Sequence, residues 1–157
     1  MSYKIRKATL KDLPVLLKFE QGVIEAERPM DPTIKDGNIH YYDMKDLIIN
    51  ENVHLVVAEY MGKIIASGYA KLMGDRPYLK HKLQGYLGFM FVSELHRGKG
   101  INQLIVDELT AWCIHKEVYE IRLDVYEDNL PAIRAYEKAG FKKHLICMRL
   151  DVQSQKN

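Results

Sequence analysis

The feature that most constrains this chain is an apolar strand that ends in a glycine-rich turn and opens a helix. Residues 84–92 form a long apolar run, and residues 98–100 (Gly-Lys-Gly) separate it from a helix expected over 101–116. The first amides of a helix point outward without partners, and the helix dipole adds partial positive charge there. Such a turn can hold a phosphate group, and Arg97 and Lys99 strengthen the same site.

Two common phosphate-binding patterns do not fit this turn. A P-loop requires GxxxxGK followed by Ser or Thr, and the chain has no such run. A dinucleotide fingerprint requires GxGxxG, but after Gly98 and Gly100 the third glycine position holds Gln103. The alternative to a phosphate site is that the glycine-rich loop serves only as a turn between strand and helix.

The order of predicted elements indicates a mixed α/β sheet. Alternating or continuous apolar runs predict strands, and apolar residues at near-helical spacing predict helices. In chain order we expect a strand over 3–8, a helix from 10 to about 28, a short helix over 41–49, a hairpin of strands 53–60 and 63–72, a strand over 84–92, a helix over 101–116, a strand over 120–125, a helix over 129–139 and a strand over 142–150. With no internal repeat and no low-complexity linker, residues 1–157 are expected to form a single domain.

Composition argues against several classes of protein. The formal net charge of +2 provides no one-signed field for nucleic acid. The longest stretch without Asp, Glu, Lys or Arg, from Leu83 to Ser93, is shorter than the ~20 apolar residues of a membrane helix. We expect a cytoplasmic protein, because no apolar signal segment follows the N-terminal positive charges. Cys113 and Cys147 sit in apolar neighbourhoods without CxxC spacing and the histidines lack zinc-site spacing, so reduced, packed thiols and no metal are expected.

Two blocks of sequence are informative together: Arg97-x-x-Gly100-x-Asn102, after the strand that ends at Val92, and the block from Asn129 to Phe141. Both resemble the GNAT superfamily of acyl-CoA-dependent N-acyltransferases. The first is similar to its pyrophosphate signature Q/R-x-x-G-x-G/A, with Asn102 at the final small position, and the second is similar to the downstream pattern N-x-x-A-x-x-x-Y-x-K-x-G-F. The resemblance implies a GNAT-like α/β (α+β) fold, with a mixed, mostly antiparallel sheet of six to seven strands, a central parallel pair that splays apart, and about four flanking helices.

The same resemblance implies that acetyl-CoA is the acetyl donor. Main-chain groups of Phe91 and Val92 would contact the pantetheine arm or the acetyl carbonyl, and the amides of residues 98–102 would hold the pyrophosphate. The full set of implied cofactor contacts is Phe91, Val92, Arg97, Gly98, Lys99, Gly100, Ile101, Asn102, Asn129, Tyr136 and Lys138.

Proton transfer is needed twice in acetyl transfer to an amine. Tyr136 occupies the family's tyrosine position, where a phenol can protonate the departing thiolate, although it also suits a core aromatic on its helix. Tyr86 stands where some family members carry a glutamate base. The base is then a carboxylate from elsewhere, with Glu27 and Asp43 as candidates, or water relays the proton.

The resulting hypothesis is an N-acetyltransferase that moves an acetyl group from acetyl-CoA to a primary amine of a small molecule or peptide by direct attack. A catalytically weak CoA-binding regulatory module is the first alternative, and a nucleic-acid-binding protein using the basic residues 80–82 is a remote one. The late strands are a candidate homodimer surface. Loop residues that could line an acceptor pocket, or simply pack, are Tyr41, Tyr42, Asp43 and Tyr78.

Overall fold

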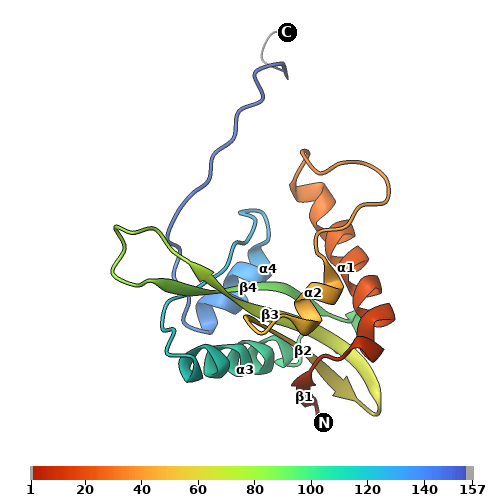
Figure 1. Ribbon diagram of the computed structural model, residues 1–157. Coiled ribbons are helices and arrows are strands. Elements are labelled where there is room, and N and C mark those ends of the chain that lie inside the picture. The colour runs from red at the N-terminus through yellow and green to blue at the C-terminus, as the bar shows by residue number, and fades with distance from the viewer. Residues whose placement is uncertain (1, 155–157) are drawn as a thin grey trace.

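A five-stranded sheet with helices on both faces forms the body of the protein, as seen in a computed structural model that describes residues 2–154 (Figure 1). The elements are β1 (Lys4–Lys7), α1 (Leu13–Glu27), α2 (Met44–Ile49), β2 (Val53–Tyr60), β3 (Lys63–Gly74), β4 (Leu83–Val92), α3 (Ile101–His115), β5 (Ile121–Arg122) and α4 (Leu130–Lys138). The strands follow the order β1-β2-β3-β4-β5, and only the β4–β5 pair is parallel. The expected mixed, mostly antiparallel sheet with four helices is confirmed.

The strand predicted over 142–150 is absent, so the sheet formed by residues 2–154 has five strands and not six to seven. These residues follow α4 as an extended chain that leaves the body of the protein (Figure 1). A strand needs a neighbour that supplies the hydrogen-bond ladder, and none is placed beside this segment within residues 2–154. The parallel pair consequently lies at one end of the sheet and is not central.

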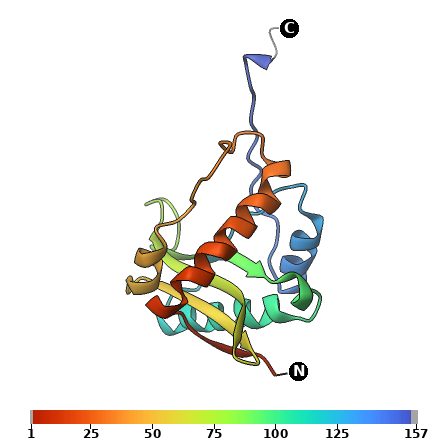
Figure 2. The same ribbon diagram turned by 90° about the vertical axis from the view of Figure 1, so that its right-hand side faces the viewer.

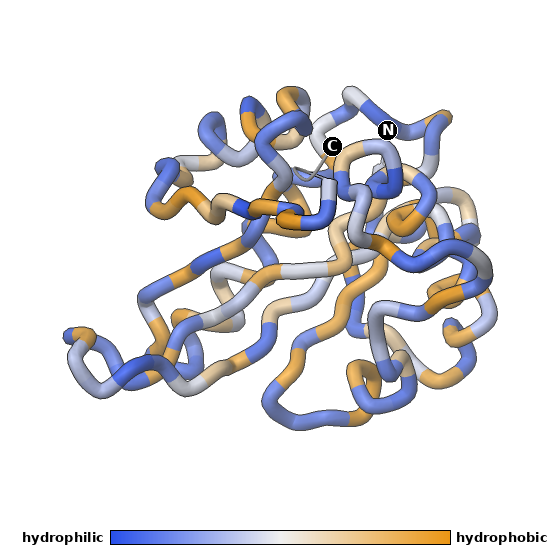
Figure 3. Tube along the Cα trace, turned by 90° about the horizontal axis from the view of Figure 1, so that it is seen from above, coloured by the Kyte–Doolittle hydropathy of each residue, from blue (hydrophilic) through white to orange (hydrophobic). Residues whose placement is uncertain are grey.

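Each face of the sheet buries its own apolar cluster. Helices α1 and α2 cover one face and α3 covers the other (Figure 2). Hydrophobic and hydrophilic residues are intermingled along the whole trace (Figure 3), but β2 and β3 contain runs of four and six consecutive buried residues, so side chains that point alternately to the two faces are buried on both. The first cluster includes Leu16, Phe19, Met44, Leu47, Val57 and Phe89, and the second includes Val56, Leu87, Ile101, Ile105, Leu109 and Cys113. As predicted, β4 contributes to both clusters and is covered on both faces.

The parallel pair separates soon after it begins. Gly85 and Tyr86 of β4 pair with β5, but no later residue of β4 does. Beyond this point Phe89 and Met90 lie opposite the single residue Gly68 of β3, which is a β-bulge. Phe89 has a φ of 54°, and a bulge of this kind bends its strand and increases the local twist. The expected splay of the two parallel strands is therefore present.

Two further expectations concern the thiols and the membrane. Both cysteines are free thiols; Cys113 is buried, as expected of a packed thiol, but Cys147 is exposed, so the packing expected of it is wrong. Across residues 2–154 no helix combines the length and apolar character needed to cross a bilayer.

Candidate active site

A pocket of about 480 Å³ lies where β4 and β5 diverge. This volume is within the range of roughly 300–1,000 Å³ common for small-molecule sites. One wall comes from β4 and another from the segment after β5, while α1, the loop that follows it, α4 and Tyr69 of β3 supply the rest. The lining residues are Val23, Glu27, Asp31, Ile34, Tyr41, Tyr42, Tyr69, Tyr86, Leu87, Gly88, Phe89, Met90, Leu123, Asp124, Val125, Tyr126, Asn129, Ala132 and Tyr136.

The pocket wall carries acidic groups and no basic ones. Glu27, Asp31 and Asp124 line it, and none of the lining residues is Lys, Arg or His. The hydroxyl of Tyr126 donates to Oδ2 of Asp31 at 2.6 Å, and the hydroxyl of Tyr86 donates to Oδ2 of Asp124 at 3.1 Å. Because like charges gathered in a cleft focus their field, this pocket favours a cationic ligand over an anionic one.

Glu27 is the last residue of α1 and is half-buried in the pocket wall. Burial raises the pKa of its carboxyl group, a hydrogen bond with Tyr41 lowers it, and the nearby carboxylate of Asp31 raises it, with a net upward shift. A carboxylate whose pKa is raised toward neutrality is a stronger base than an exposed one, which suits proton abstraction.

Tyr136 projects from α4 into the same pocket. Burial, with a smaller contribution from the negative charge of Glu27, raises the pKa of its phenol to about 12. The hydroxyl group is therefore protonated at neutral pH and is available as a proton donor. The ring also lies 5.8 Å from the ring of Phe141, centroid to centroid, so the side chain takes part in packing as well.

The turn before α3 has the geometry expected of an anion site. Gly98 and Gly100 have φ values of 75° and 80°, and a Cβ at either would meet no atom within 4 Å. These glycines therefore serve to adopt the left-handed backbone conformation and to leave space for a ligand to approach the main chain, and they do not serve to pack against other atoms. No side chain caps the start of α3, and Arg97 and Lys99 are exposed beside it. Free amides, partial positive charge and two cations suit the pyrophosphate of acetyl-CoA.

Other residues that the resemblance implied as cofactor contacts lie on α4 and at the end of β4. Asn129 caps α4, as predicted, by accepting a hydrogen bond from the Ala132 amide at 3.3 Å. Lys138 is exposed at the last position of α4. The carbonyl of Val92 accepts a hydrogen bond from Nε of Arg97 at 3.0 Å, which ties the turn to the end of β4.

Of three other residues in this set, Phe91 and Ile101 pack in the two apolar clusters. The ring of Phe91 packs on that of Phe19 at 4.5 Å, so its side chain belongs to the α1 face. The side chain of Ile101 is buried under α3, and Asn102 is half-buried on the first turn of that helix.

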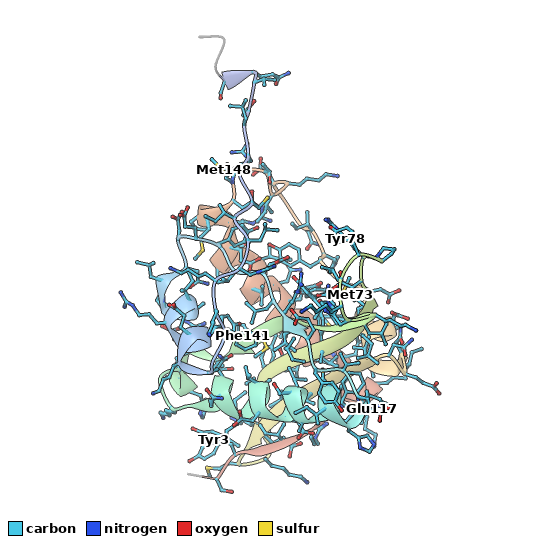
Figure 4. All side chains as sticks on the ribbon, turned by 90° about the vertical axis from the view of Figure 1, so that its left-hand side faces the viewer. Tyr3, Met73, Tyr78, Glu117, Phe141 and Met148 are labelled. Carbon is cyan, nitrogen blue, oxygen red and sulfur yellow. The ribbon has the colours of Figure 1, made fainter. Side chains whose placement is uncertain are left out.

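The acceptor-side candidates divide into two groups. Tyr86 and Glu27 line the pocket, as do Tyr41 and Tyr42. Asp43 instead caps α2 by accepting a hydrogen bond from the Asp46 amide at 3.2 Å, and it is not a lining residue. Tyr78 is likewise outside the lining, exposed in the loop between β3 and β4 (Figure 4).

Glu20, which the sequence did not single out, organises one wall of the pocket. Its buried carboxylate accepts hydrogen bonds from the amides of Tyr41 and Tyr42, both at 2.9 Å, and contacts Nδ1 of His40 at 2.8 Å. Asp31, Asp124 and Tyr126 were also missed. Asp124 lies within the predicted strand 120–125, near its carboxyl end, which is a usable signal, whereas the position of Asp31 depends on contacts distant in sequence.

Comparison with known proteins identifies a family and a fold. The profile of the Acetyltransferase (GNAT) family matches residues 21–141. A predicted acetyltransferase from Clostridium acetobutylicum, solved with acetyl-CoA, superposes with a TM-score of 0.75 at 21% identity and 98% coverage of both chains. A mutant of the BH1408 protein from Bacillus halodurans superposes with a TM-score of 0.85 at 25% identity, covering 94% of this chain and 98% of the other.

Two curated relatives match shorter stretches. Streptothricin acetyltransferase of Escherichia coli is 36% identical over 50 residues, which are 32% of this chain and 29% of the relative. Glucosamine 6-phosphate N-acetyltransferase of Trypanosoma brucei brucei is 32% identical over 92 residues, which are 58% of this chain and 59% of the relative. The match therefore spans less than two thirds of the length of either relative.

Proposed function

The chain belongs to the GNAT acetyltransferase family, and from that premise we propose that it transfers an acetyl group from acetyl-CoA to a primary amine of a small cationic molecule. The observation that carries this proposal is the meeting of Glu27 and Tyr136 in one pocket, at the point where β4 and β5 separate. Amine acetylation uses a base that takes a proton from the amine and an acid that gives a proton to the departing thiolate. An ionised carboxylate and a protonated phenol in one cavity can fill these two roles. We expect the reaction to take place in the cytoplasm.

Acetyl-CoA supplies the acetyl group as a reactive thioester. The turn at residues 98–102 is the proposed pyrophosphate site, because its glycines leave room for close approach and its helix start is uncapped. Main-chain groups of Phe91 and Val92 are proposed to contact the pantetheine arm, and β4 pairs with no strand on its β5 side beyond Tyr86 within the described chain. Side-chain contacts are proposed for Arg97, Lys99, Asn102, Asn129 and Lys138.

Proton movement in the proposed reaction uses two lining residues. An ammonium substrate first loses a proton to the carboxylate of Glu27, directly or through one water, and the neutral nitrogen then forms the new C–N bond. As the C–S bond breaks, the phenol of Tyr136 donates its proton to the departing sulfur, and the proton that the attacking nitrogen loses on becoming an amide returns to Tyr136, directly or through water. Charge developing on the carbonyl oxygen would be stabilised by a main-chain amide of β4, a contribution on the order of 3 kcal/mol per donor.

The charge of the pocket supports a particular class of acceptor. Three lining carboxylates and no lining cation favour an amine that carries a further positive charge. By the same argument a phosphorylated amino sugar is disfavoured, although one curated relative is named for that substrate. The relative named streptothricin acetyltransferase supports acetyl transfer and does not by itself define the class of acceptor. Peptide amines fit where the neighbouring residues are basic.

Release of free CoA thiol from acetyl-CoA tests the proposal. We expect thiol release with a diamine, an aminoglycoside or a lysine-rich peptide, and much less with glucosamine 6-phosphate. A CoA-binding regulatory module would instead show a higher melting temperature with acetyl-CoA and no amine-dependent thiol release. No change in melting temperature at millimolar acetyl-CoA would contradict the cofactor assignment as well.

A further inference from the structure

Aromatic rings make up much of the wall of the acidic pocket. Of the ten tyrosines in the chain, six line it: Tyr41, Tyr42, Tyr69, Tyr86, Tyr126 and Tyr136. Phe89 adds a seventh ring. The tyrosines are therefore concentrated at this cavity and are not spread evenly through the core.

Four of these rings form a continuous surface around Tyr42. Its ring lies 5.8 Å from the rings of Tyr41 and Tyr69, centroid to centroid, and is nearly perpendicular to both, at 87° and 90°. The ring of Phe89 lies 5.2 Å away and is tilted by 52°. We call Tyr41, Tyr42, Tyr69 and Phe89 the aromatic wall. The face of such a ring attracts a cation that lies within about 6 Å of its centre.

The carboxylates of the pocket already accept hydrogen bonds from its phenols. The pairs are Glu27 with Tyr41, Asp31 with Tyr126 and Asp124 with Tyr86. Asp31 also accepts from the amide and the hydroxyl of Thr33. Burial is the largest cause that raises the pKa of these three phenols, so they stay protonated at neutral pH. The bonds thus use acceptor positions on the carboxylates and leave their negative charge in place.

The negative field extends over the aromatic wall. After the larger effect of burial, the charge of Glu27 helps to raise the pKa of both Tyr41 and Tyr42. It acts in the same way on Tyr126 and Tyr136. A cation that lies against the aromatic wall is therefore within the field of a carboxylate as well as in contact with aromatic faces.

Primary and quaternary ammonium groups make different demands on such a site. A primary ammonium is compact, strongly hydrated and carries three hydrogen-bond donors, so free acceptor oxygens hold it best. A trimethylammonium group has no donor, and aromatic faces and a negative field hold it. Carboxylates that are partly occupied by phenols and stand beside aromatic rings match the second group better than the first.

We propose that the pocket selects primary amines whose far end carries a quaternary ammonium group over those whose far end is a second primary ammonium. The aromatic wall contacts the methyl groups, and the lining carboxylates supply the negative field. This inference deepens the proposed function and rests on it for the reacting end of the substrate, where the primary amine attacks acetyl-CoA.

Three acceptors with the same four-carbon chain separate the effect of charge from that of alkylation. They are (4-aminobutyl)trimethylammonium, 1,4-diaminobutane and the neutral isostere 5,5-dimethylhexan-1-amine. We expect kcat/KM for the first to exceed that for each of the others by at least about ten-fold. A diamine used as well as the trimethylammonium compound would overturn the inference, because free carboxylate oxygens would then hold the cation. A neutral isostere used equally well would overturn it too, since the wall would then bind apolar shape alone.

Equilibrium binding separates failure of this inference from failure of the proposed function. Calorimetric titration of the protein with butyltrimethylammonium and with butylammonium requires neither acetyl-CoA nor turnover. We expect the quaternary ion to bind at least about ten-fold more tightly. That result without acetylation of any amine would contradict the proposed function and support the site. Equal affinities would contradict the site even if diamines are acetylated.

Two substitutions of Tyr42 test the ring itself. Tyr42→Leu removes the central ring of the aromatic wall and should reduce the preference for butyltrimethylammonium to about three-fold or less, whereas Tyr42→Phe keeps a ring and should retain it. Tyr60→Leu is the matched control, because Tyr60 is also half-buried and its ring contacts those of Tyr3 and His96 outside the pocket. Melting temperatures report whether each variant is folded, and the wild-type titrations stand independently of them. An unchanged preference in folded Tyr42→Leu would contradict the aromatic wall as the binding surface.

Discussion

The hydroxyl of Tyr126 donates a hydrogen bond to Oδ2 of Asp31 at 2.6 Å and joins two segments that are 95 residues apart in the chain. Asp31 belongs to the segment after α1, and Tyr126 belongs to the segment between β5 and α4. Both line the pocket, so this bond fixes the separation of two of its walls. The same contact lowers the pKa of Asp31, after the larger effect of a hydrogen bond from Thr33.

Tyr126→Phe is expected to weaken amine binding more than it slows the chemical step. The substitution keeps the ring and removes the bond between the two walls, so KM for the amine should rise about ten-fold while kcat changes about two-fold or less. Tyr78→Phe is the matched control, because its hydroxyl accepts a hydrogen bond from Arg76 outside the pocket. Steady-state kinetics with one cationic amine measure both constants. A fall confined to kcat would argue against this positioning role.

Glu27→Gln is expected to reduce kcat/KM by about a hundred-fold or more at neutral pH, because it removes the proposed base. The pKa of Glu27 is raised by burial, and only the ionised form accepts a proton. The activity of the wild type should therefore rise with pH as Glu27 ionises, at a pKa above the ordinary glutamate value. This acidic limb of the pH–activity profile should be missing in the variant. Glu25→Gln, on the exposed side of the same helix, is the control. A retained limb would exclude Glu27 as the base.

Tyr136→Phe is expected to lower kcat by about a hundred-fold, because the departing sulfur then lacks its proton donor. With a pKa of about 12 the phenol stays protonated through the physiological range, so Tyr136 should contribute no basic limb to the profile below about pH 11. Tyr119→Phe changes a phenol that is 73% exposed and outside the pocket, and it should leave turnover intact. Unchanged turnover in Tyr136→Phe would remove the acid assignment and leave the packing role.

Gly100→Ala separates backbone strain from cofactor contact. Gly100 and Gly62 have φ values of 80° and 76°, and both have open space at the Cβ position. Each substitution should cost about 1 kcal/mol of stability through the left-handed backbone. Only Gly100→Ala should also weaken acetyl-CoA binding, by about ten-fold, because its methyl group hinders the approach of the pyrophosphate. Calorimetric titration measures the difference, and equal affinities would contradict the turn as the anion site.

Local rules account for the elements that the sequence predicted well. The cap formed by Asn129, the turn before Ile101 and the hairpin around Gly62 depend on residues within a few positions of one another. β5 is shorter than the predicted strand 120–125, because its neighbour β4 bends away at the bulge. A bulge depends on pairing between strands, which periodicity along one strand does not report.

The pocket too could be predicted from the sequence only in part. Tyr136 and the glycine turn were found from motifs, but the acidic wall formed with Asp31 and Asp124 depends on how distant segments meet. The predicted strand over 142–150 was wrong for the described chain, although its alternating pattern is real. Periodicity identifies a segment suited to pairing and does not say which edge receives it.

The most direct measurement compares 1,4-diaminobutane with 4-aminobutanoate as acetyl acceptors, since both present a primary amine on a four-carbon chain and differ in the charge of the far group. The acidic pocket predicts a kcat/KM at least about ten-fold higher for the diamine, a difference of about 1.4 kcal/mol. The ratio should shrink in Asp124→Asn, which removes one of the lining carboxylates. Equal rates, or a preference for 4-aminobutanoate, would contradict a pocket that selects cationic amines.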